Sequence, residues 1–113
     1  MEIKCNNRTF QIWKYHVSHS MLLVRSPQNK EHKTNIDIIF HGVRFINLPN
    51  IFYGMSISPI SPEIDKDLLV MIENMQYNPN EVLVFRGDKQ KFYVIASGFS
   101  VEENEDSIFD VKF

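Results

Sequence analysis

The chain has 113 residues, of which 43% are hydrophobic and 23% are charged. This length corresponds to one domain, and this composition is typical of a globular protein rather than a disordered one. The net charge is −2 and the sequence has no basic stripe with interleaved aromatic residues, which argues against nucleic-acid binding. We therefore expect a single domain over residues 1–113.

Charge is distributed unevenly along the chain. Residues 1–50 contain seven basic and three acidic side chains, whereas residues 51–113 contain five basic and eleven acidic ones. Such a split can mark an interaction surface, but more often the two halves simply face each other within one fold.

Cys5 is the only cysteine of the chain. It excludes a disulfide within the chain and a zinc site built from cysteines. The sequence has neither a stretch that resembles a signal peptide nor an apolar segment long enough to cross a membrane. These features lead us to expect a soluble cytoplasmic protein with no membrane partner.

Alternation of apolar and polar residues predicts strands in most of the chain. In segment 8–15, Phe10 and Ile12 point to one face of the expected strand. Segment 26–34 is entirely polar apart from its proline and predicts an exposed loop. Gly42 interrupts the alternation of segment 35–48 and predicts a bulge or bend there. Strands are expected over residues 1–5, 8–15, 21–25, 35–48, 53–59, 81–85, 91–101 and 107–113.

Segment 61–75 predicts the one helix. Ser61 suits the N-cap and Pro62 the first helical position. Acidic residues follow where the helix dipole favours anions. At 100° per residue, the apolar residues fall on one stripe, which should pack on a sheet. This stripe consists of Ile64, Leu68, Met71, Ile72 and Met75, with Leu69 at its edge.

The last three expected strands, 81–85, 91–101 and 107–113, should form an antiparallel meander. Residues 86–90, with the sequence RGDKQ, join the first two of them. We interpret the RGD tripeptide as part of a hairpin turn rather than as an adhesion motif.

These elements predict an α+β fold, a mainly antiparallel curved sheet or small sandwich of six to eight strands with one packed amphipathic helix. The expected core consists of Phe10, Ile12, Leu22, Val24, Ile36, Ile38, Phe40, Leu68, Ile72, Val82, Val84, Tyr93, Ile95 and Phe109.

Two histidines, His16 and His19, precede the strand at 21–25. A spacing of three aligns two side chains on a helix, whereas here the pair lies between two strand signals and converges only if a turn brings it together. His32 and His41 lie in a loop and a strand without supporting ligands. We therefore expect no metal site, and we expect His19 to form a hydrogen bond with the backbone at the turn.

Arg25 ends an apolar strand and lies opposite Asp37 across the loop 26–34. One interpretation is a structural ion pair between the two strands. The alternative is that Arg25 shares an exposed face with Trp13, Tyr15 and Arg44, which together have the composition of a protein-binding hot spot.

A stretch of residues 10–26 carries a resemblance. It has the pattern FxxWxYxxSHxxLLxRS and is followed at 34–43 by TNIDIIFHGV. These segments resemble a group of short uncharacterised bacterial proteins in which a similar SHxxLLLRS stretch precedes a strand. Val24 stands where that group has a third leucine. The resemblance implies a bacterial, cytoplasmic protein, and it transfers neither a function nor a catalytic residue.

Two functions from different classes remain open. The sequence has no nucleophile elbow, glycine-rich phosphate loop or zinc-protease motif, so we expect a non-enzymatic protein-interaction module without a cofactor. Such a module would bind a protein partner, form a homodimer, or act as an immunity-type protein that blocks a toxin. The alternative is a small enzyme or ligand-binding protein with a pocket of histidine, arginine and tyrosine. The candidate residues for either role are Trp13, Tyr15, His16, His19, Arg25, Asp37 and Arg44.

Overall fold

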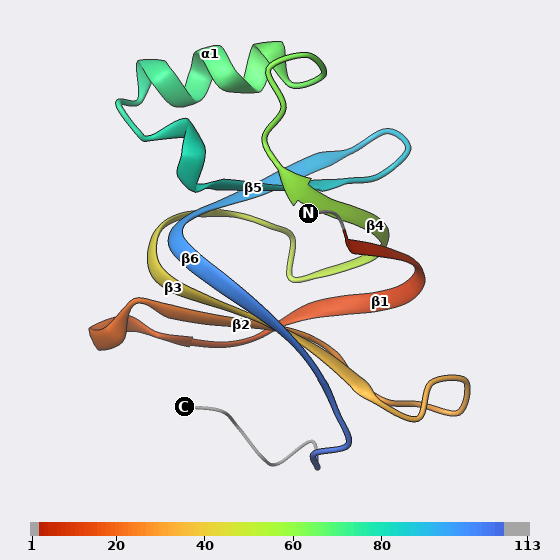
Figure 1. The fold of residues 1–113 in the computed structure, drawn as a ribbon. Helices are drawn as coiled ribbons and strands as arrows, with labels where there is room; N and C mark the ends of the chain where they lie inside the picture. Colours follow the sequence, from red (N-terminus) through yellow and green to blue (C-terminus); the bar gives the residue numbers. More distant parts are fainter. Residues whose placement is uncertain (1–2, 108–113) are drawn as a thin grey trace.

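A computed structural model of the protein describes residues 3–107, with side chains described from residue 7 onward. In this part of the chain, six antiparallel strands form a closed barrel in the order β1-β2-β3-β6-β5-β4 (Figure 1). The strands are β1 (Ile3–His16), β2 (Met21–Ser26), β3 (Asn35–Asn47), β4 (Ile51–Pro59), β5 (Val82–Arg86) and β6 (Lys91–Asn104). The helical elements are the α-helix α1 (Lys66–Asn74) and two single turns of 3₁₀ helix, η1 (Val17–His19) and η2 (Pro79–Glu81).

The barrel closes because β1 is long enough to pair with two strands. Its first part, Ile3–Gln11, pairs with β4, and its second part, Gln11–His16, pairs with β2. The register of β1 shifts once within each of these pairings. Such irregularities bend a strand and increase its twist, which a small barrel requires.

The barrel interior holds one apolar cluster. On β2, β5 and β6 its side chains alternate with residues on the opposite face, as the pleat requires, whereas the spacing is interrupted once on β3 and once on β4. The buried Phe10 and Phe52 stack with their ring centroids 5.9 Å apart, and Phe52 meets Phe85 edge-on at 5.4 Å. The cluster consists of Phe10, Leu22, Val24, Ile38, Phe40, Val43, Phe52, Met55, Ile57, Leu83, Phe85, Val94 and Ala96.

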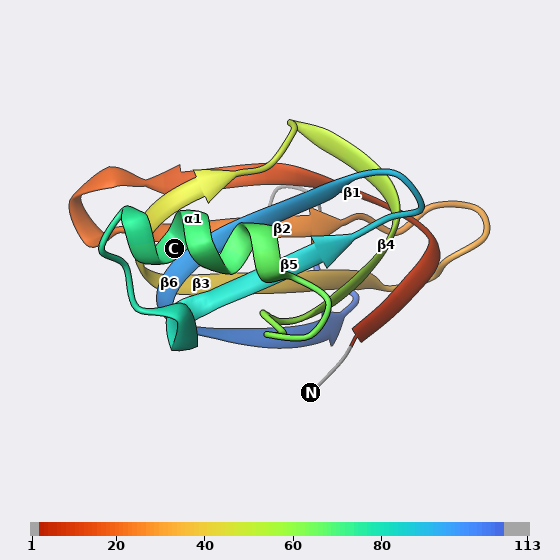
Figure 2. The ribbon, with the colours of Figure 1, turned by 90° about the horizontal axis from the view of Figure 1, so that it is seen from above.

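A second, smaller apolar cluster lies outside the barrel, between α1 and the neighbouring strands β5 and β6. Figure 2 shows α1 lying across these two strands. Leu68 and Ile72, one helical turn apart, are the buried residues of the helix. They pack with Val82, Val84, Tyr93 and Ile95.

Gly42 bends β3, as its interruption of the sequence pattern predicts. Its φ is +63°, in the region that favours glycine, and the register of β3 against β6 shifts between Val43 and Phe45. A Cβ added at Gly42 would lie 2.5 Å from the Ser97 Oγ atom of β6. The predicted bend is confirmed.

The expected fold class is wrong. The fold is a closed six-stranded barrel with one short α-helix rather than a curved sheet or small sandwich with one packed amphipathic helix, because β1 and β4 pair and close the sheet. The pairing of strands that are far apart in the sequence depends on their register and on bends within them. Local alternation of apolar and polar residues predicts neither of these. The antiparallel arrangement of the strands is as expected.

The helix also begins later than predicted. Ser61 and Asp65 exchange hydrogen bonds, with Asp65 N–H donating to Ser61 O at 2.8 Å and Ser61 N–H donating to Asp65 Oδ2 at 2.7 Å. These bonds close a separate turn before the helix, so Asp65 rather than Ser61 is the N-cap residue. Of the predicted stripe, Ile64 and Met71 remain exposed.

Most of the predicted core is confirmed. Eleven of its members are buried, and Ile12 and Ile36 are half-buried against the interior cluster. The expected strands 1–5 and 8–15 belong to one strand, β1. Phe109 and nearly all of the expected strand 107–113 lie outside the described residues.

Candidate functional site

Arg25 and Asp37 form a buried ion pair on directly opposed positions of β2 and β3. Arg25 Nε donates to Asp37 Oδ1 at 2.6 Å and Arg25 Nη2 donates to Asp37 Oδ2 at 2.9 Å, and both side chains are fully buried. The guanidinium also lies 5.2 Å from the ring centroid of Trp13, and Asn104 donates to Asp37. This bidentate geometry is that of the structural pair considered from the sequence, and burial removes Arg25 from any exposed face.

His16 and His19 meet at the turn between β1 and β2. Their rings stack with centroids 4.4 Å apart and an interplanar angle of 18°. The single 3₁₀ turn η1 brings them together, because residues three apart eclipse in this type of helix. The sequence predicts a turn between the two strands, but not that this turn would stack the two rings.

The remaining two candidates, Tyr15 and Arg44, lie on β1 and β3. Tyr15 is 40% exposed near the end of β1, and Arg44 is an exposed residue of β3 that donates to Glu81 and to Ser97 Oγ. The seven candidate residues therefore do not form one site. None of them lines the surface cavities that follow.

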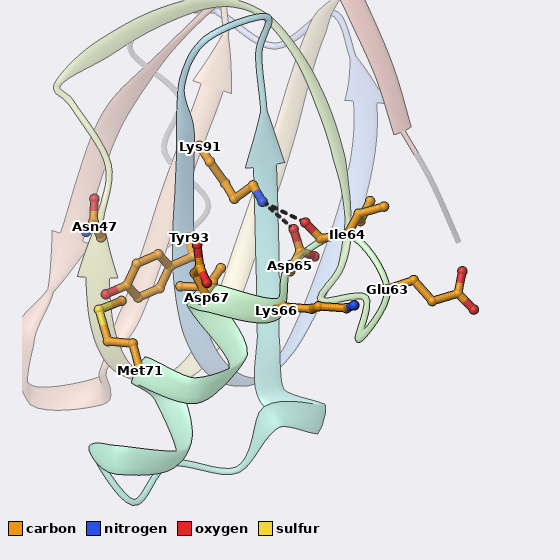
Figure 3. Close-up of a pocket in the computed structure, with 10 residues that line it drawn as sticks. Asn47, Glu63, Ile64, Asp65, Lys66, Asp67, Met71, Lys91 and Tyr93 are labelled. Carbon is orange, nitrogen blue, oxygen red and sulfur yellow. Dashed lines mark hydrogen bonds and ion pairs between the residues drawn. The ribbon is translucent and has the colours of Figure 1, made fainter.

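One cavity of about 610 Å³ lies beside α1 (Figure 3). Its volume falls in the usual range of binding pockets, although it is widely open to solvent. Its walls come from the segment before α1, the first two turns of α1, the end of β3 and the start of β6. The lining residues are Asn47, Glu63, Ile64, Asp65, Lys66, Asp67, Leu68, Met71, Lys91 and Tyr93.

Asp65 fixes one wall of this cavity through ion pairs with two basic side chains, Arg86 and Lys91. Its carboxylate accepts from Lys91 Nζ at 2.6 Å and is also paired with Arg86, while only 1% of the residue is exposed. Lys91 Nζ further donates to Ile64 O, as Figure 3 shows. The segment that precedes α1 is thereby held against the β5–β6 hairpin.

The electrostatic balance at Asp65 favours the charged carboxylate. Burial acts to raise its pKa, but the hydrogen bonds from Lys91 and from the Ser61 N–H, with the charges of Arg86 and Lys91, hold the pKa below its ordinary value of 3.8. A carboxylate paired in this way is a structural anion rather than a proton acceptor.

The apolar part of the cavity comes from the helix stripe that the barrel does not cover. Ile64 is 64% exposed and Met71 is 41% exposed, whereas Leu68 between them is buried. Tyr93 of β6 completes this wall. Glu63 and Asp67 are two further acidic residues of the lining. The site can accept an apolar side chain that has a positive charge beside it.

Two further cavities are described. One of about 590 Å³ lies between β4 and the β5–β6 turn, beside the exposed Tyr53 and the residues 87–90. The other, of about 290 Å³, lies where β4 ends and η2 leads into β5. Neither contains a cluster of residues with catalytic chemistry.

Sequence reasoning missed the cavity beside α1, although part of its signal was present. The apolar stripe of segment 61–75 has more members than a nine-residue helix can bury against two strands. That surplus could have indicated exposed apolar residues. Asn47 and Lys91 reach the cavity through tertiary pairing, for which the sequence has no local signal.

Among the described residues, no group of three or more histidine, cysteine, aspartate or glutamate side chains is placed to hold a metal ion. Within residues 3–107, no helix combines the length and apolar character needed to cross a bilayer. Comparison of the chain with protein-family models, with curated proteins and with solved structures finds no match. The resemblance to short bacterial proteins therefore stays a prediction.

Proposed function

We propose that this chain is a non-catalytic binding protein that docks a protein partner at the cavity beside α1. The observation that carries the proposal is the exposure of Met71 on α1 and of Ile64 in the turn before α1, on either side of the buried Leu68. Exposed apolar side chains beside a concave, polar-rimmed surface are characteristic of protein interfaces. We further propose a cytoplasmic location, which the single cysteine Cys5 supports.

The charges around the cavity indicate which kind of partner segment would fit it. The residues that line the cavity include three acidic side chains, Glu63, Asp65 and Asp67, and two basic ones, Lys66 and Lys91, which give a formal charge of −1. Residues 51–113, which contain most of this surface, have eleven acidic and five basic residues. A fitting partner segment has an aliphatic or aromatic anchor flanked by lysine or arginine.

Photo-crosslinking in cells tests this proposal directly. A photoactivatable amino acid replaces Met71 in one variant and Val70 in the other. Val70 is the matched control, because it is an exposed neighbour on the same helix that does not line the cavity. We expect a discrete crosslinked partner from position 71 and a much weaker product from position 70. Equal products from both positions, or none from position 71, would contradict the proposal.

Mass spectrometry of the product identifies the partner and distinguishes its type. A different protein with basic residues beside the crosslinked anchor supports the proposed docking surface. A second copy of this chain would show self-association and would contradict the proposed basic partner.

A further inference from the structure

Tyr53 places an aromatic ring on the outer surface of the barrel. Its neighbour Phe52 belongs to the interior cluster, so the pleat of β4 directs Tyr53 outward, where it is 63% exposed. The side chain lines the cavity of about 590 Å³ between β4 and the β5–β6 turn, a volume in the usual range of binding pockets. The ring therefore offers an aromatic surface to a ligand from solution.

Two glycines keep the cavity open beside this ring. Gly54 follows Tyr53 with φ +68°, a conformation that favours glycine. Gly87 begins the turn between β5 and β6, and its N–H donates to Gln90 O at 2.8 Å. A Cβ added at Gly87 would lie 3.1 Å from Met55 Sδ, closer than ordinary packing allows. Neither glycine has a side chain that could fill the space beside Tyr53.

Hydrogen-bonding side chains lie on both sides of the ring. On the side of the β5–β6 turn, Asp88, Lys89 and Gln90 are exposed and line the cavity. On the other side, the exposed Thr9 of β1 is directly opposite Tyr53, so its hydroxyl lies on the same face of the sheet as the ring. Together these groups can both donate and accept hydrogen bonds.

The charges of the lining favour an uncharged ligand. Asp88 and Lys89 are the charged residues that line the cavity, and their formal charges cancel. A nucleotide would bring phosphate charges for which this surface has no net positive charge. A saccharide ring is neutral, and its C–H face complements the electron-rich face of an aromatic ring. Its hydroxyl groups, at the edge of the ring, meet the surrounding hydrogen-bonding side chains.

We propose that Tyr53 and the β5–β6 turn form a binding site for a neutral saccharide. One sugar ring stacks on Tyr53, and its hydroxyl groups form hydrogen bonds with Asp88, Gln90 and Thr9. The cavity shares no lining residue with the cavity beside α1. Variants of one site therefore leave the other intact, and the two proposals can fail independently.

Calorimetric titration of the full-length chain tests this site with a panel of neutral oligosaccharides, namely cellotetraose, chitotetraose, mannotetraose and xylotetraose. We expect at least one of them to bind. Tyr53→Ala should weaken that binding by about tenfold or more, equivalent to about 1.4 kcal/mol, whereas Tyr53→Phe should retain it because the aromatic face remains. Tyr15→Ala is the matched control with parental affinity, because Tyr15 is an exposed tyrosine outside the cavity.

Two further measurements distinguish a neutral ligand from an anionic one. The affinity for the saccharide should be the same at low and high salt, because no ion pair forms. Adenosine monophosphate, which combines an aromatic ring with a phosphate, should not bind. Circular dichroism checks the folding of each variant, and threonine, which favours strands, replaces alanine at position 53 if that variant unfolds.

Three results would overturn the site. The first is that no saccharide of the panel binds. The second is that Tyr53→Ala and Tyr15→Ala have equal affinities for the saccharide that binds. The third is a salt-dependent binding of adenosine monophosphate that requires Tyr53, which would assign the ring to an anionic ligand instead.

Discussion

Arg25 and Asp37 place two opposite charges in a fully buried environment between neighbouring strands. Removal of a charge from water is costly, and two hydrogen bonds between the groups offset that cost only while both are present. The fold is therefore stable with these buried charges only while both residues are present, because each charge compensates the other.

Removal of one partner should destabilise the protein strongly. We expect Arg25→Met to lower the free energy of unfolding by about 3–5 kcal/mol, because it leaves a buried carboxylate uncompensated. Replacement of both residues, in Arg25→Met with Asp37→Leu, should recover much of that loss. Urea denaturation measures the three values, and a double variant no more stable than the single one would show that the pair is not the cause.

Asp65 should make stability depend on pH in the acidic range. Its pKa is lower in the folded protein than its ordinary value of 3.8, so its contribution is fully present above that value and is lost as pH falls through the folded pKa. Asp65→Asn removes this contribution. The difference in unfolding free energy between parent and variant should therefore shrink when the pH is lowered below 3.8.

Asp67→Asn is the control for this measurement, because Asp67 is exposed on the first turn of the same helix. Denaturation of all three proteins at neutral and acidic pH gives the comparison. A gap between parent and Asp65→Asn that is constant across the range would contradict the assigned role of the carboxylate.

At the scale of single elements, β3 depends on its bend at Gly42. An alanine there would have a positive φ, and its Cβ would approach the Ser97 side chain closely. We expect Gly42→Ala to cost about 1–2 kcal/mol from the left-handed conformation alone. At Gly98 of β6, a Cβ would meet nothing within 4 Å, so Gly98→Ala serves as the control. Thermal unfolding should separate the two variants, and equal melting temperatures would count against the bend.

The same elements show how far local sequence patterns extend. The bend at Gly42 and the Arg25–Asp37 pair were predictable, because each depends on residues within one strand or one hairpin. The start of α1 was not, since Asp65 is held by Arg86 and Lys91 from a hairpin more than twenty residues away. The approach of His16 to His19 depends on a single 3₁₀ turn, too short to leave a periodic pattern.

At the scale of the whole molecule, closure of the barrel depends on the contact between β1 and β4. Phe10 and Phe52 are paired positions of these strands, and their rings stack inside the barrel. Alternation identified Phe10 as a core residue, but the pairing that makes the barrel joins strands separated by some forty residues. Such long-range pairing is why the sequence predicted a curved sheet or small sandwich instead of a barrel.

Truncation of this contact should destabilise the whole fold. We expect Phe52→Ala to cost about 3–5 kcal/mol, the usual range for a large buried aromatic residue. Its neighbour Tyr53 is 63% exposed, so Tyr53→Ala should change stability by no more than about 0.5 kcal/mol. Chemical denaturation that shows similar losses for both variants would be inconsistent with closure through the interior aromatic cluster.

The most direct test of the proposed docking surface is the affinity of the purified, crosslink-identified partner for two matched variants. Met71→Asp places a charge inside the cavity beside α1, whereas Val70→Asp places the same charge on the same helix outside it. We predict a loss of about tenfold or more, about 1.4 kcal/mol, for Met71→Asp and parental affinity for Val70→Asp. Equal affinities of the two variants would contradict the account.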